Sequence, residues 1–114
     1  MSTEYRIDYI EFPSADGARS RQFFADAFGW RFTDYGPNYS AIDNAGIDGG
    51  IDAAAERAAQ PLVILKADDL EQALIQVVGA GGVVTRDPFD FPGGRRFHFR
   101  EPGGNELAVW TDRA

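Results

Sequence analysis

The sequence predicts an α+β fold in which one βαβββ unit occurs twice. In each half, an apolar segment is followed by an aspartate, a helical pattern and a glycine. The aspartates Asp16 and Asp69 lie 53 residues apart, and the glycines Gly29 and Gly82 have the same separation. A constant offset through several structural features indicates a duplicated unit.

The duplication predicts one domain made of two modules, over about residues 1–57 and 58–114. A module of that length buries too little apolar surface to be stable alone, so we expect the two to fold together. Their sheets should be antiparallel or mixed and should form a groove. A groove of this kind is where we expect a small organic molecule to bind.

In module one, residues 5–13 alternate loosely between apolar and polar and predict a strand. Ser14 or Asp16 can cap the helix that follows. That helix carries Phe23, Phe24 and Phe28 at helical spacing, so we expect these rings in the core. Gly29 should end the helix. Three strands and a linker follow, over residues 30–35, 39–43, 47–51 and 52–60.

Module two repeats this order. Residues 62–67 predict a strand, and Asp68 or Asp69 can cap the next helix, which the glycines at 79–82 end. Strands are expected over residues 83–87, 95–100 and 105–111, with a loop at 88–94 that could cover a site. Consecutive strands after each helix favour antiparallel hairpins, which is typical of the α+β class.

Charge and composition exclude several classes of function. The net charge of −7 and the pI of about 4.5 argue against nucleic acid or an anionic membrane as a partner. The chain has no cysteine, which excludes disulfides, thiolate metal sites and thiol catalysis. No apolar run approaches the roughly 20 residues of a membrane span. Because the N-terminus shows no signal-peptide pattern, we expect a cytoplasmic protein.

Two motifs resemble signatures of a known family. The first runs from Asp16 through Phe23-Phe24 to Phe28-Gly29-Trp30 and resembles the pattern D-x6-F-Y-x3-F-G-W. The second, over residues 101–107, resembles D-P-x-G-N-x-(I/L)-E. Both patterns belong to the vicinal oxygen chelate superfamily of glyoxalase I, bleomycin-resistance proteins, fosfomycin-resistance enzymes and extradiol dioxygenases. The resemblance covers nearly the whole chain and implies paired βαβββ modules and a homodimer.

The resemblance also implies where a divalent metal would be held. In the superfamily's enzymes, His and Glu ligands come from the first and last strands of each module. Those positions fall here on Tyr9, Leu62 and Ala108, and in the last strand of module one only Asp48 could be a ligand. Leucine and alanine bind no metal ion, so we expect no cofactor and no family metal site.

A displaced metal site is the alternative. Glu11, His98 and Glu106 are each expected to face the groove, and one histidine with two carboxylates suits Zn, Fe or Mn. These residues would then serve a metal-dependent lyase, isomerase or dioxygenase. Their positions on three strands do not establish that they converge.

Other residues are candidates for ligand contact or catalysis. His98 is the only histidine, and with Glu11 as its partner it could act as an acid or base; a structural role is equally open. Tyr9, Glu106 and Trp110 are candidates for ligand contact, although ion pairing and core packing also explain them. Arg96, next to Arg95, could bind an anionic group through paired N–H donors.

Three functions follow, and whether the protein is an enzyme stays open. The first is a metal-free binder of small molecules, similar to bleomycin-resistance proteins, for which an acidic chain suits a cationic ligand. The second is the metal-dependent enzyme, and the third is a metal-free enzyme using His98 and Glu11. The absence of ligands at positions 62 and 108 favours the first or the third.

Overall fold

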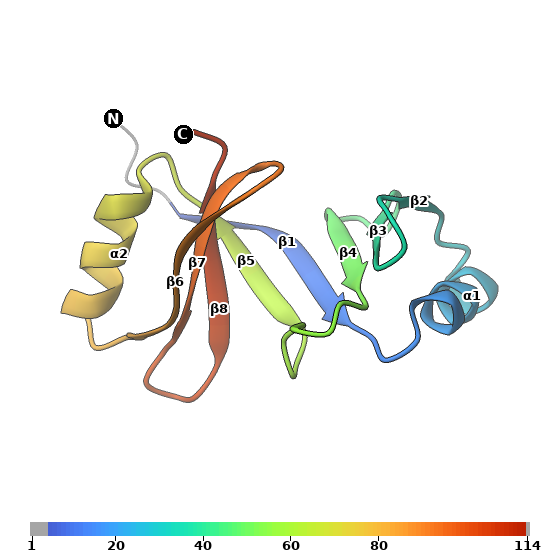
Figure 1. Cartoon of the computed structure of the whole chain (residues 1–114), viewed down its shortest axis with the longest axis horizontal. Helices are drawn as coiled ribbons and strands as arrows, with labels where there is room; N and C mark the ends of the chain where they lie inside the picture. Colours follow the sequence, from blue (N-terminus) through green and yellow to red (C-terminus); the bar gives the residue numbers. More distant parts are fainter. Residues whose placement is uncertain (1–4, 114) are drawn as a thin grey trace. The chain divides into compact units, whose positions relative to one another are not determined.

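The computed structural model describes residues 5–113 and has the predicted βαβββ-βαβββ order of elements (Figure 1). The first four residues, on which the expected absence of a signal peptide partly rests, lie outside the described residues. Contacts divide the chain into an N-terminal unit, Tyr9–Leu62, and a C-terminal unit that joins residues 5–8 to residues 63–113. Within residues 5–113, no helix is long and apolar enough to cross a membrane.

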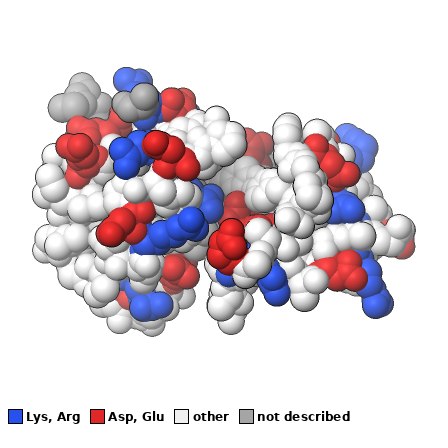
Figure 2. Space-filling model, in the orientation of Figure 1, with Lys and Arg blue, Asp and Glu red and all other residues white. Residues whose placement is uncertain are grey.

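On the face of the molecule seen in Figure 2, acidic and basic side chains do not separate into large patches of one sign. Figure 2 shows them interspersed on the visible face of the molecule, although the net charge of the chain is −7. The charge of any one site therefore has to be derived from its own residues.

The N-terminal unit contains a mixed sheet and one helix. Its sheet has the order β2-β3-β4-β1, in which β1 and β4 are parallel and the other neighbours are antiparallel. The elements are β1 (Arg6–Pro13), α1 (Gly17–Phe28), β2 (Phe32–Asp34), β3 (Tyr39–Ile42) and β4 (Gly49–Asp52).

Helix α1 begins and ends as predicted, but its rings are not core. Asp16 accepts a hydrogen bond from the Arg19 backbone N–H at 3.1 Å, and Gly29 ends the helix at φ 71°. The expected burial is wrong for Phe23 and Phe28, which are 60% and 62% exposed, because these rings pack against each other at the surface of the helix. Phe24 is half-buried and packs against Phe12 of β1.

The C-terminal unit repeats the arrangement. Its sheet has the order β5-β8-β7-β6, in which β5 and β8 are parallel and the other neighbours are antiparallel. The elements are β5 (Leu62–Lys66), α2 (Leu70–Gly79), β6 (Val83–Phe91), β7 (Gly94–Arg100) and β8 (Glu106–Thr111).

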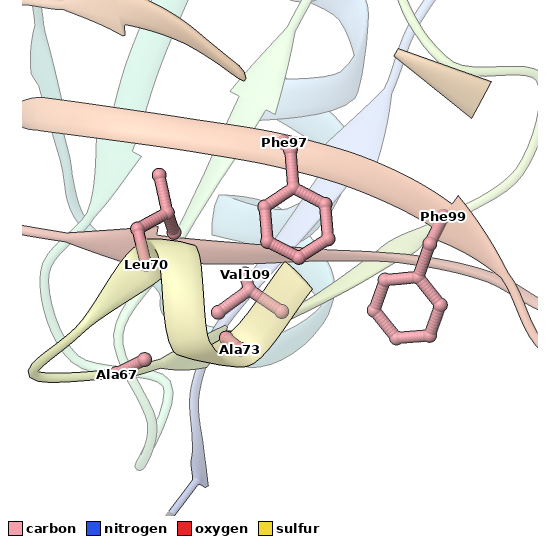
Figure 3. Close-up of a cluster of buried hydrophobic side chains, with 6 residues drawn as sticks. All are labelled: Ala67, Leu70, Ala73, Phe97, Phe99 and Val109. Carbon is pink, nitrogen blue, oxygen red and sulfur yellow. The ribbon is translucent and has the colours of Figure 1, made fainter. Parts of the chain in front are cut away.

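Helix α2 covers one face of this sheet and closes the main core. Asp69 caps the helix by accepting a hydrogen bond from the Gln72 backbone N–H at 3.0 Å. Apolar side chains of the helix and the strands meet beneath it (Figure 3): Ala67, Leu70, Ala73, Phe97, Phe99 and Val109. Because side chains alternate along a strand, the residues next to Phe97, Phe99 and Val109 in the sequence project from the opposite face of the sheet.

The loop expected over residues 88–94 is wrong, because β6 continues to Phe91. Pro88 is tolerated there because β6 is an edge strand, where a missing backbone N–H breaks no ladder on the open side. The register with β7 shifts between Val84 and Arg86 and again between Arg86 and Phe89. Bulges of this kind redirect side chains and are common next to functional sites.

Candidate functional site

Several of the predicted site residues share the sheet face opposite α2 in the C-terminal unit. His98 pairs with Ala108 on one side and with Arg86 on the other, and Arg96 pairs with Trp110. Paired residues of adjacent strands project to the same face. We call this surface the His98 face; its polar and aromatic members are Lys66, Arg86, Phe89, Phe91, Arg96, His98, Arg100, Glu106 and Trp110.

The side chain of His98 is buried, and only part of its hydrogen-bonding capacity is used. Its exposure is 7%, and its Nδ1 lies 3.9 Å from Oε2 of Glu106, which accepts a hydrogen bond from Oγ1 of Thr85 at 2.7 Å. Its Nε2 is buried and has no hydrogen-bond partner among the described residues. The imidazole therefore has one nitrogen that faces a carboxylate and one buried nitrogen that makes no hydrogen bond.

Two effects keep this imidazole uncharged. Burial lowers the pKa of His98, and the positive charges of Arg96 and Arg86 lower it further, against the opposing effect of Glu106, so that the pKa falls to about 4. His98 is then neutral near pH 7. A general base is most effective when its pKa lies near the working pH. Hydrogen bonding therefore suits this histidine better than acid–base catalysis.

The predicted partnership of His98 with Glu11 stays a prediction. Glu106 is the carboxylate that faces His98 within the C-terminal unit, whereas Glu11 belongs to the N-terminal unit.

The aromatic ring of Phe89 packs against His98, and two guanidinium groups lie next to that ring. The centroids of the Phe89 and His98 rings are 5.8 Å apart. The guanidinium carbon of Arg86 lies 3.7 Å from the centroid of Phe89, and that of Arg96 lies 5.4 Å from it and 5.6 Å from the centroid of Phe91. These distances are in the range of cation–π contact.

Trp110 has a fixed orientation on the same face. Its Nε1 donates to both carboxylate oxygens of Asp8, at 3.1 and 3.3 Å. Nζ of Lys66 lies 5.1 Å from the indole centroid and forms a 3.1 Å ion pair with Asp112. The Phe91 ring lies 6.0 Å from the indole. The indole is thus held as a flat apolar surface.

Sequence reasoning missed Arg86, Phe89 and Phe91. Phe89 and Phe91 lie in the segment that was expected to be a loop, and Arg86 lies in the expected strand, where the bulges set it opposite His98. The alternation of Arg86, Phe89 and Phe91 is also hidden by the bulges, which break the period of two along the strand.

Tyr9 and Glu11 belong to a second cluster, in the N-terminal unit, that also contains Tyr39. Oη of Tyr39 donates to Oε2 of Glu11 at 2.9 Å, and the two tyrosine oxygens are 2.5 Å apart. Glu11 is 6% exposed. Burial and the negative charge of Glu11 raise the pKa of Tyr39, so this phenol stays protonated and can act as a donor.

Gly50 makes room for this cluster. It pairs with Glu11 in β1 and with Ala41 in β3, on the face to which the two tyrosines project. A Cβ at this position would lie 2.5 Å from Oη of Tyr9 and closer still to Oη of Tyr39. The two tyrosine hydroxyl groups thus occupy the space that a side chain at position 50 would need.

The ligand positions implied by the resemblance do not fit a metal ion. Gly50 pairs with Glu11 in one unit, and Ala108 pairs with Ile64 in the other. Glu11 and Ile64 are 53 residues apart and are therefore equivalent positions of the two modules. Gly50, and not Asp48, is thus the counterpart of Ala108. Of the resulting set, Gly50, Leu62 and Ala108 have no donor side chain. Residues 5–113 contain no group of three or more His, Asp or Glu side chains that could hold a metal.

A family model matches most of the chain. It is described as the Glyoxalase/Bleomycin resistance protein/Dioxygenase superfamily, and it matches residues 6–109. The comparison with curated proteins gave no match.

Solved structures share the fold at low sequence identity. An NAD-dependent benzaldehyde dehydrogenase from Legionella pneumophila has a TM-score of 0.75 at 14% identity, over 90% of this chain and 96% of that one. A glyoxalase/bleomycin resistance protein/dioxygenase superfamily member from Vibrio splendidus 12B01 has a TM-score of 0.71 at 16% identity, over 95% and 99%. A Mn(II)-bound glyoxalase from Novosphingobium aromaticivorans has a TM-score of 0.68 at 24% identity, over 93% of this chain and 38% of that one.

Proposed function

Because the chain belongs to the glyoxalase/bleomycin resistance protein/dioxygenase superfamily, we propose that it binds a small organic molecule and does so without the family's metal ion. The fold hosts several activities, so membership alone does not fix the function. The proposal therefore depends on the residues of the His98 face.

The unpartnered nitrogen of His98 is the observation that carries the proposal. A buried polar atom without a hydrogen bond costs roughly 1–3 kcal/mol, and native proteins contain few of them. A ligand with a complementary polar group next to Nε2 would remove that cost.

The aromatic side chains around His98 favour a flat ligand. Binding sites for small molecules combine apolar and aromatic walls with a few polar groups that fix orientation. Phe89 and His98 supply such a combination, and Trp110, held by Asp8, adds a rigid apolar surface.

The side chains at the positions implied for metal ligands support binding without a metal. Gly50, Leu62 and Ala108 stand at ligand positions and have no side chain that can donate electrons to a metal. The metal-dependent alternative would need Glu11 together with His98 and Glu106. Of these, His98 and Glu106 lie 3.9 Å apart within one unit, and Glu11 belongs to the other unit.

We also propose that the chain forms a homodimer, in line with its family resemblance, and that α1 lies in the interface. Phe23 and Phe28 expose most of their surface on this helix, and none of its residues is buried. Contiguous exposed apolar surface of this kind marks interaction sites, and aromatic residues are enriched in interfaces.

The test of ligand binding uses His98 as a spectroscopic probe. Since His98 is the only histidine, protein produced without a polyhistidine tag gives one set of imidazole NMR signals. Flat small molecules that bind should shift these signals, and His98→Ala should weaken their binding in calorimetry. Tyr35→Ala, which removes a 65% exposed ring from the N-terminal unit, is the control and should bind as the parent does. Binding that leaves His98 unshifted and survives His98→Ala would contradict the proposal.

A further inference from the structure

The charges next to His98 indicate what kind of molecule the proposed site takes. We propose that the ligand is a small aromatic carboxylate, whose acidic group contacts Arg86 and Nε2 of His98 and whose ring packs against the neighbouring aromatic side chains. This inference rests on the proposed function. It differs from the cationic ligand expected from the acidic composition.

Arg86 is placed to receive a carboxylate. The β6 bulges set it directly opposite His98, and its guanidinium lies over the Phe89 ring. Arg86 is exposed and forms no ion pair with any residue of the described part of the chain. A guanidinium offers parallel N–H donors that match the two oxygens of a carboxylate.

Arg86 places a positive charge next to His98, although the chain as a whole is acidic. The charged groups that act on His98 come from the three strands around it: Arg86 from β6, Arg96 from β7 and Glu106 from β8. Since Arg86 has no ion-pair partner among the described residues, its charge favours an anionic group next to the imidazole and disfavours a cationic one. Glu106 is also engaged by Oγ1 of Thr85, which further reduces its availability to a cationic ligand.

His98 completes the contact from the protein side. A neutral imidazole can carry its hydrogen on Nε2 and donate it to a carboxylate oxygen. An anion at this position would also raise the pKa of His98, because a nearby opposite charge favours the protonated form. Binding of a carboxylate should therefore be accompanied by proton uptake at low pH, which a neutral ligand would not cause.

Three matched probes test the ligand class on the full chain: benzoate, benzyl alcohol and benzylammonium. We expect benzoate to shift the His98 imidazole signals and to bind at least about tenfold more tightly than the other two in calorimetry. Arg86→Gln should weaken benzoate binding about tenfold, and Arg86→Lys should weaken it less. Arg31→Gln, which removes an exposed arginine from the N-terminal unit, should leave it unchanged.

The possible failures are distinguishable. If benzyl alcohol or benzylammonium shifts His98 as strongly as benzoate, or if Arg86→Gln binds benzoate as Arg31→Gln does, the ligand class is wrong and the proposed binding stands. If neither these probes nor a wider set of flat molecules shifts His98, both the ligand class and the proposed function are overturned.

Discussion

Tyr39 donates a hydrogen bond to Glu11, with its Oη 2.9 Å from Oε2, and this contact joins β3 to β1 inside the N-terminal unit. Tyr9 extends the contact through its own hydroxyl, and Gly50 provides the space that both tyrosines occupy. At the positions where the family resemblance implies metal ligands, this unit therefore has a hydrogen-bonded cluster of side chains.

Gly50→Ala should destabilise the protein, because its Cβ would overlap the Tyr39 hydroxyl. We expect the free energy of unfolding in urea to fall by about 1–3 kcal/mol, as for overpacking in a core. Gly79→Ala is the matched control, since a Cβ there meets nothing within 4 Å and the backbone conformation is unstrained. Equal stability of the two variants would show that the hydroxyl cluster does not depend on Gly50.

Tyr39 should make stability fall in alkaline solution. Its pKa is raised in the folded protein by burial and by Glu11, so the folded state holds this proton more tightly than the unfolded state. The resulting stabilisation is complete below the unfolded pKa of about 10 and is lost as the pH rises above it. In urea titrations above that pH, Tyr39→Phe should lose stability less steeply than the parent. Identical slopes would mean that Tyr39 does not contribute to this dependence.

His98 should make the stability of the protein fall in acidic solution. Its pKa is about 4 in the folded protein, below the ordinary value of 6.5, so the unfolded state binds the proton more readily. The stability due to neutral His98 is therefore complete above pH 6.5 and declines as the pH falls toward 4. The imidazole NMR titration should have its midpoint near 4 in the free protein. A midpoint at or above 6.5 would contradict the burial and cation effects assigned to this site.

His98→Gln isolates that contribution to stability. Carboxylates also titrate in this range, so the informative quantity is the difference in unfolding free energy between the parent and the variant at each pH. We expect this difference to change between pH 6.5 and 4 and to be constant above pH 6.5.

Removal of the exposed rings of α1 should change the oligomeric state. The parent should elute as a dimer of the 12.5 kDa chain, and the double variant Phe23→Ser with Phe28→Ser should elute as a monomer, as measured by light scattering after gel filtration. Val83→Ser, which changes a 61% exposed apolar residue of the C-terminal unit, should remain dimeric. A monomeric parent would refute the dimer, and a dimeric double variant would refute the role of α1.

Local signals made the element order predictable from the sequence. Asp16 and Asp69 cap their helices and Gly29 ends the first, because capping depends on residues within a turn of the helix end. The burial of Phe23 and Phe28 could not be predicted in this way, since helical spacing shows that rings share a face but not what covers that face.

The candidate site was predictable only in part. His98 on β7 and Glu106 and Trp110 on β8 lie on one face of the sheet as alternation requires, and His98 and Glu106 lie close together. The contribution of β6 was not predictable, because Pro88 and the bulges are compatible with a strand only at a sheet edge. The role of Tyr39, two strands away from Glu11, depends on the absent side chain of Gly50 in the strand between them, and the paired glycines of β4 were its only local signal.

The most direct test of metal-free binding at the His98 face is calorimetry of the tightest flat ligand with chelator-treated protein, repeated after addition of Mn, Fe, Ni or Zn. The account predicts the same dissociation constant in every case, with the same shift of the His98 imidazole signals. Binding that is absent from the treated protein and is restored by one equivalent of metal would contradict it.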